Sequence, residues 1–128
     1  MSYHISKTLA LPFDEAVAAT TTALQKHGFG VLTEIDVQAT LKKKLDVAFR
    51  PYRILGACNP KMAYQALEIE DKIGTMLPCN VIVQRREDGR VEVSAVDPVA
   101  SMQAIDNPEL ARLAGTVREM LRQVIAEI

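Results

Sequence analysis

The C-terminal segment, residues 107–128, places its apolar side chains along one side of a single long helix. It begins with Asn107, Pro108 and Glu109, which supply a cap, a first-turn proline and an acid at the positive end of the helix dipole. The apolar stripe consists of Leu110, Leu113, Val117, Leu121, Val124 and Ile128. Because the opposite side carries charged residues, this helix is expected to pack on a core with one face only.

A β-hairpin is predicted just before this helix. Residues 79–84 and 91–96 are rich in β-branched side chains, and the turn between them contains Asp88 and Gly89, a favoured pair in tight hairpin turns. Asp97 and Pro98 then end the second strand.

The first half of the chain alternates strands and helices. Residues 2–10 alternate with a period of two, which predicts a strand. Apolar residues then repeat at helical spacing from Phe13 until Gly28, which supplies a left-handed stop. The remaining predicted elements are a strand at 29–35, a helix at 37–45 capped by Asp36, a strand at 52–58, and a short helix that begins at Asn59-Pro60 and runs through Leu67.

The order β-α-β-α-β-α-β-β-α predicts one α+β domain over residues 1–128. Helical connections combined with one hairpin suggest a mixed sheet with the helices on one face, in two layers. The opposite face of such a sheet then needs cover. A second subunit is the simplest candidate, so a homodimer or higher homo-oligomer is expected.

Composition narrows the class of partner. Fifteen basic and sixteen acidic residues give a net charge of −1, which argues against a nucleic-acid-binding protein. No run approaches the roughly 20 apolar residues that span a bilayer. The first residues lack the features of a signal peptide, and the expected compartment is the cytoplasm. No nucleotide-cofactor motif is present.

Cys58 and Cys79 are the leading candidates for chemistry. Cys58 stands just before the predicted helix start, near unpaired backbone N–H groups and the positive end of the dipole, which favour a thiolate. The short helix between the two cysteines is compatible with both sulfurs lying at one edge of the sheet. Buried, unreactive thiols are the alternative interpretation, because free cysteine is among the most often buried residue types.

A bound transition metal on Cys58 and Cys79 is a further possibility, although two cysteines fall short of the four ligands of a structural zinc site. Glu34 and Asp36 flank Ile35 and can present two carboxylates on one strand face, which suits cation binding or acid–base chemistry. Alternatively, Asp36 only caps a helix and Glu34 is a surface residue.

A cysteine nucleophile needs a base, and only His4 or His27 can be its histidine partner. His27 also suits the last turn of a helix for structural reasons alone, and His4 suits an exposed strand position. Lys42, Lys43 and Lys44 form the centre of a basic cluster, which is expected to be a solvated helix face.

Three segments carry a family resemblance: GFGVLTEIDV at 28–37, YRILGACNP at 52–60 and LPCNV at 77–81. In these and the flanking segments the chain resembles the domain-of-unknown-function 302 family of small bacterial and archaeal proteins. The resemblance implies an α+β two-layer fold and brings no established activity. The matching motif residues are Glu34, Asp36, Cys58, Asn59, Pro60, Pro78 and Cys79, which favours one site built from both cysteine segments.

These observations leave three functional hypotheses. The first is a non-enzymatic binding or thiol/metal-handling protein, with Cys58, Asn59 and Cys79 in its site and Glu34 and Asp36 as acidic neighbours. The second is an enzyme that uses Cys58 as its nucleophile. The third is a structural module that associates with itself.

Overall fold

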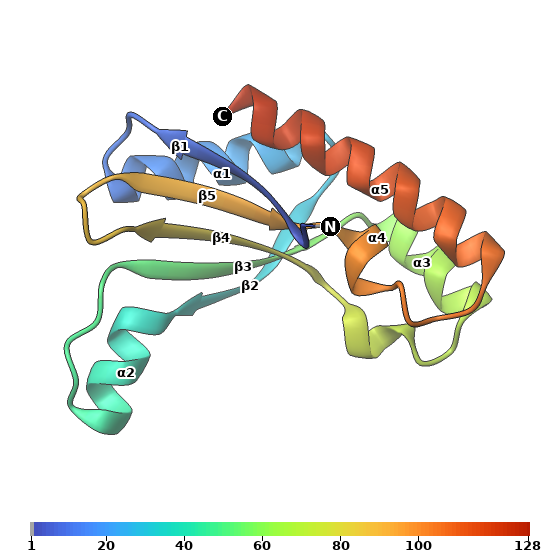
Figure 1. Ribbon diagram of the computed structural model, residues 1–128, viewed down its shortest axis with the longest axis horizontal. Coiled ribbons are helices and arrows are strands. Elements are labelled where there is room, and N and C mark those ends of the chain that lie inside the picture. The colour runs from blue at the N-terminus through green and yellow to red at the C-terminus, as the bar shows by residue number, and fades with distance from the viewer. Residues whose placement is uncertain (1) are drawn as a thin grey trace.

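The computed structural model describes residues 2–128 and shows an α+β domain in the predicted element order (Figure 1). Met1, which belongs to the predicted domain range, lies outside the described residues. The elements are β1 (His4–Leu9), α1 (Phe13–Lys26), β2 (Gly30–Asp36), α2 (Val37–Leu45), β3 (Tyr52–Cys58), α3 (Pro60–Ile69), the 3-10 helix η1 (Ile73–Met76), β4 (Cys79–Arg85), β5 (Val91–Val96), α4 (Pro98–Ser101) and α5 (Pro108–Glu127).

The five strands form one sheet in the order β1-β5-β4-β3-β2, and every neighbouring pair is antiparallel. The expectation of a mixed sheet was therefore wrong. A parallel neighbour requires a helix that carries the chain back along the sheet to its starting end. Here α2 and α3 sit at opposite ends of the sheet, so each next strand returns antiparallel beside the last. Only α1 crosses the sheet, from one edge strand to the other.

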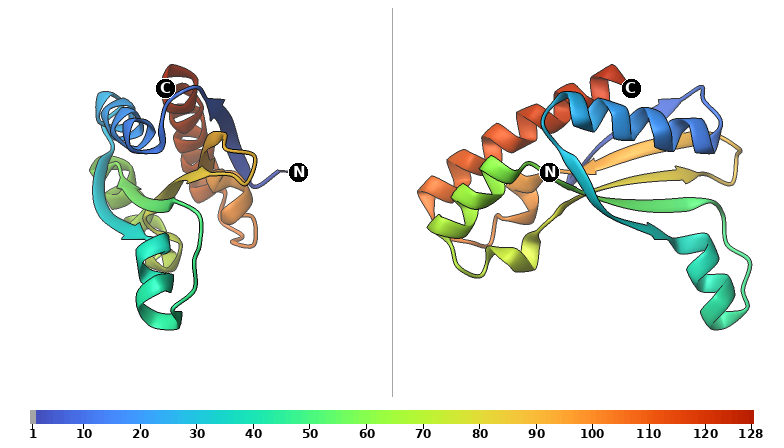
Figure 2. Two further views of the ribbon diagram at one scale, coloured as in Figure 1. Left: turned by 90° about the vertical axis from the view of Figure 1, so that its left-hand side faces the viewer. Right: turned by 180° about the vertical axis from the view of Figure 1, so that it is seen from behind.

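Helices α1 and α5 pack side by side on one face of the sheet (Figure 2). They cover the inward side chains of β4 and β5, of which Val81, Val83 and Val93 are fully buried. A second, smaller core cluster forms where α5 meets α3, η1 and α4, around Ile73 and Leu110. The predicted two-layer arrangement is confirmed in this respect, and the core lies between the sheet and these two long helices.

The helix ends follow the sequence signals. The side chains of Asp36, Asn59 and Asn107 each accept a hydrogen bond from a backbone N–H in the first turn of α2, α3 and α5. Gly28 adopts a φ of 82° two residues after the end of α1, and Gly89 has a φ of 85° in the β4–β5 turn. These left-handed conformations cost glycine little, which explains its place at both positions.

Two short elements were absent from the sequence-based prediction. Asp97 and Pro98 do end β5, but they also begin the one-turn helix α4, and the Asp97 side chain accepts a hydrogen bond from Val99 N at 3.0 Å. The loop around Gly74 contains η1. Neither turn is long enough to show a period. Within residues 2–128, no helix combines the length and the apolar character needed to cross a membrane.

We expect Gly56→Ala to destabilise the protein. An added Cβ at Gly56 would overlap Thr33 Oγ1 on β2 and come within 2.8 Å of Pro78 Cγ, which belongs to a rigid ring. Such overpacking typically costs about 1–3 kcal/mol in the free energy of unfolding. Urea denaturation with Gly30→Ala as the matched control checks this, because a Cβ at Gly30 meets nothing within 4 Å. Equal stability of the two variants would contradict the packing described here.

Candidate functional site

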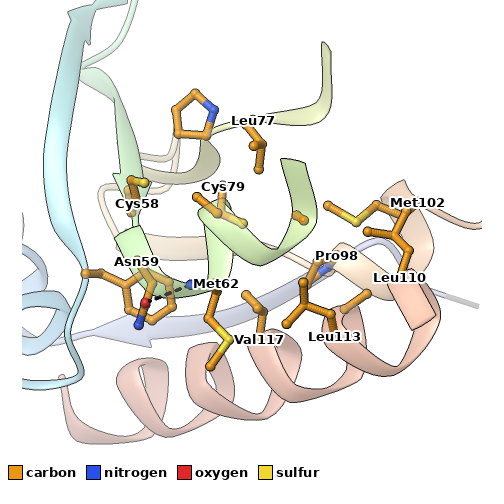
Figure 3. A pocket seen from close by; sticks show the side chains of 16 residues that line it. Cys58, Asn59, Met62, Leu77, Cys79, Pro98, Met102, Leu110, Leu113 and Val117 are labelled. Atoms are coloured by element: carbon orange, nitrogen blue, oxygen red, sulfur yellow. Dashed lines mark hydrogen bonds between the residues drawn. The ribbon is translucent and has the colours of Figure 1, made fainter. Parts of the chain in front are cut away.

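A pocket of about 40 Å³ lies at the end of the sheet where β3 and β4 meet α3, α4 and α5 (Figure 3). Its wall is almost entirely apolar. The residues that line it are Phe29, Ala57, Cys58, Asn59, Met62, Ala63, Ala66, Leu77, Pro78, Cys79, Pro98, Met102, Leu110, Leu113, Ala114 and Val117. Among them only Asn59 has a side chain with nitrogen or oxygen, so the pocket suits an apolar occupant.

Both cysteines are free thiols and both line this pocket. Cys79 begins β4 opposite Ala57, and Cys58 is the next residue along β3. Cys79 is buried, whereas Cys58 is partly exposed. Burial raises the pKa of the Cys79 thiol to about 11, and the charge of a Cys58 thiolate adds to the shift. Cys79 is therefore a neutral thiol near pH 7, which makes it a poor nucleophile.

Asn59 has a structural task at the pocket. Its side-chain oxygen accepts a hydrogen bond from Met62 N at 3.3 Å, which caps α3 (dashed in Figure 3). A Cβ at Gly28 would come within 3.2 Å of its amide nitrogen. The end of α1 thus lies against Asn59 at the start of α3.

Two methionines belong to the pocket wall and were missed in the sequence analysis. Met62 follows the α3 cap, and Met102 follows α4. Figure 3 shows these two side chains and the two cysteines distributed around the pocket, on different sides of it. The cap at Asn59 fixes where α3 begins, so Met62 was within reach of sequence reasoning. Met102 was not, because α4 itself had no sequence signal beyond its first two residues.

Glu34 and Asp36 do share one face of β2, as the sequence suggested, but they do not line the cysteine pocket. Arg53 on β3 pairs with both. Its Nη1 lies 2.7 Å from Glu34 Oε1, and its Nε lies 3.6 Å from Asp36 Oδ2. Glu34 is four residues along β2 from Gly30, the partner of Cys58, which corresponds to roughly 13 Å. Glu34 and Asp36 therefore lie outside the pocket that the two cysteines line.

The histidines lie elsewhere as well. His4 Nδ1 contacts Ser6 Oγ at 2.6 Å on β1, and His27 Nε2 lies 2.9 Å from Glu127 Oε2, where the ends of α1 and α5 meet. Neither lines the pocket. The described chain thus offers Cys58 no histidine base there.

The basic cluster does not gather into a site. Lys42, Lys43 and Lys44 are exposed on α2, in agreement with the solvated-face interpretation. Arg50 stacks on Phe49, with 4.5 Å between its guanidinium carbon and the ring centroid, and donates to Gln84. Across residues 2–128, no group of three or more His, Cys, Asp or Glu side chains could hold a metal ion.

Comparison with known proteins agrees with this fold. The profile of the family described as "Domain of unknown function DUF302" matches residues 5–128. The chain is similar to the crystal structure of an uncharacterized conserved DUF302 protein from Bacillus stearothermophilus, with a TM-score of 0.93 and 24% sequence identity over 99% of this chain and 98% of that one. No curated protein matches.

We expect the two cysteines to differ sharply in alkylation. With a pKa near 11 instead of the ordinary value of 9.0, Cys79 has about a hundredfold smaller thiolate fraction at pH 8 than an unfolded cysteine, and burial restricts access further. Iodoacetamide modification followed by peptide mass spectrometry should show Cys58 reacting first and Cys79 lagging until the pH approaches 11. Urea-unfolded protein is the control, in which both should react alike. Equal rates in the folded protein would contradict the burial of Cys79.

Proposed function

The chain belongs to the domain of unknown function DUF302 family, whose description names no activity, and from the pocket we propose that it is a non-enzymatic protein that binds a small apolar ligand. One observation carries the proposal: sixteen residues from five regions of the chain enclose a pocket with a single amide as its only nitrogen- or oxygen-bearing side chain. Apolar pockets of this kind bind water poorly and bind apolar atoms or molecules well.

The size of the pocket limits the ligand. At about 40 Å³ it is much smaller than a cavity of about 150 Å³ that accepts benzene. The sulfur atoms of the lining cysteines and methionines favour a polarisable ligand, because thioether and thiol sulfur make strong dispersion contacts. Met62 and Met102 have flexible side chains that can adjust to such a guest.

The neutral state of Cys79 also fits a binding role better than a catalytic one. A thiol held protonated by burial packs as a small hydrophobic group. Catalysis by Cys58 would require a base, and the pocket contains no histidine or carboxylate from the described residues. The enzymatic alternative thus has no supporting contact.

A second candidate function is the binding of a soft metal ion such as Cu⁺. It is favoured by the presence of Cys58 and Cys79 in the wall of one pocket, because soft metal ions prefer thiolate and thioether ligands. A metal would displace the proton from each thiol, so its affinity would rise with pH.

We expect xenon to occupy the pocket. In protein labelled with ¹³C at the methionine methyl groups, xenon pressure should shift the Met62 and Met102 signals in a saturable way. The Met120 signal should stay unchanged, because Met120 packs against the main core and does not line the pocket.

A filling variant provides the control. Ala63→Leu places extra carbon in the pocket wall and should abolish the saturable shift, whereas Ala111→Leu makes the same change at an exposed position of α5 and should preserve it. Shifts that persist in Ala63→Leu, or that appear equally on Met120, would refute the apolar-ligand proposal.

Titration with Ag⁺, a redox-stable substitute for Cu⁺, tests the second candidate. If the metal binds the two thiols, Cys58→Ser and Cys79→Ser should each lower the affinity by at least about tenfold, and the affinity of the wild type should increase with pH. An Ag⁺ affinity that stays unchanged in either variant would exclude a site that both thiols share. The xenon result does not depend on this outcome.

A further inference from the structure

One face of the sheet has no covering helix. Helices α1 and α5 both pack on the opposite face (Figure 2). Strand register places Ile35, Ile54 and Ile82 side by side in one row across β2, β3 and β4 on the uncovered face. Ile35 is 48% exposed and the other two are partly exposed. Three adjacent β-branched side chains in contact with water favour burial against another surface.

Two segments flank this face at opposite ends of the strands. Helix α2 joins β2 to β3 at one end, and η1 with the loop before it joins α3 to β4 at the other. Figures 1 and 2 show both segments on the side of the molecule away from α1 and α5. They also expose apolar side chains, with Leu45 66% and Met76 40% accessible.

Helix α2 contributes little to its own domain. It has nine residues and none of them is buried. A helix this short is marginal in water by itself, and most helices gain their stability by packing an apolar face. Leu45 and Val47, which remain exposed at its end, therefore lack the cover that such a helix normally finds.

The two flanking segments carry opposite charge. Residues 37–46 contain three lysines and a single acid, whereas residues 68–72 contain three acids and a single lysine. Glu68 lies in the last turn of α3 and Glu70 directly follows it, where the negative end of the helix dipole disfavours acids. The stability of α3 therefore does not explain the acidic residues at its C-terminal end.

We propose that the uncovered face binds a second copy of this chain in a two-fold symmetric dimer. A two-fold axis presents the same patch on both subunits, and an axis that runs across the strands brings the basic α2 of each copy to the acidic 68–72 segment of the other. The isoleucine rows then form the apolar centre, and the charged ends form the rim that fixes the register. This arrangement covers the sheet face and α2 together.

A second copy is the occupant because the complementarity lies within one chain. A face with a single sign of charge would repel its own copy. Here the basic end of each copy attracts the acidic end of the other copy. The near-neutral net charge of −1 adds little long-range repulsion between the copies. A different protein partner would leave wild-type protein monomeric, and that result would overturn the proposal.

Charge reversal gives a sharp test by sedimentation velocity at micromolar concentration. Lys43→Glu with Lys44→Glu makes both ends of the face acidic, and Glu68→Lys with Asp71→Lys makes both ends basic. All four positions are exposed, so the circular dichroism spectra should match that of the wild type. Each double variant alone should dimerise at least about tenfold more weakly than the wild type.

An equimolar mixture of the two double variants should restore dimers, because each end then meets its opposite. Arg112→Glu with Arg122→Glu on exposed positions of α5 changes the net charge as much as the lysine variant and should leave dimerisation unchanged. Ile35→Lys should weaken the dimer while its circular dichroism spectrum still matches that of the wild type. A monomeric wild type, double variants that dimerise normally, or a mixture that fails to recover would each overturn the proposal.

Discussion

Helix α5 packs against both hydrophobic clusters and thereby holds the domain together. Its buried residues Val117, Leu121 and Val124 belong to the large cluster over the sheet, whereas Leu110 and Ala114 belong to the smaller one beyond it. Twenty helical residues span about 30 Å, whereas the seven residues of β4 span about 24 Å. The helix therefore extends past the strands, and α3, η1 and α4 fill the space beneath its N-terminal half. The pocket lies at this junction because it is where two separately packed clusters meet.

Polar contacts hold the C-terminal end and the middle of α5. At its C-terminal end, Lys7 Nζ donates to the main-chain oxygens of Ile128 and Ala126 at 2.7 and 3.1 Å. Near the pocket, Asp97 is 6% exposed, caps α4, and lies 3.8 Å from Arg118 Nη1. A buried carboxylate without such partners would be costly, so this pair ties α4 to α5. The pocket wall next to α4 is thus held by charge as well as by apolar contact.

Local sequence signals predicted the elements well because their causes are local. The caps at Asp36, Asn59 and Asn107 and the glycine stop at Gly28 all depend on residues within one helical turn. Strand pairing depends on residues far apart, and the same element order allows both a mixed and an antiparallel sheet. The pairing of Arg53 with Glu34 and Asp36 was missed for this reason, since it requires β2 and β3 to be antiparallel neighbours.

The candidate site likewise depends partly on local sequence signals and partly on contacts between residues far apart in the sequence. The capping signal at Asn59 places Cys58 at the end of one strand, and the strand pattern that follows Cys79 places this residue at the start of another. Only the tertiary packing of α5 decides that the space between them is apolar. The similarity at 24% identity and a TM-score of 0.93 shows that this backbone arrangement does not need one particular set of side chains. For the proposed binding function, ligand preference would therefore depend on the residues that line the pocket in this chain. Its four sulfur-bearing side chains, Cys58, Cys79, Met62 and Met102, would set such a preference, because the remaining wall is hydrocarbon apart from one amide.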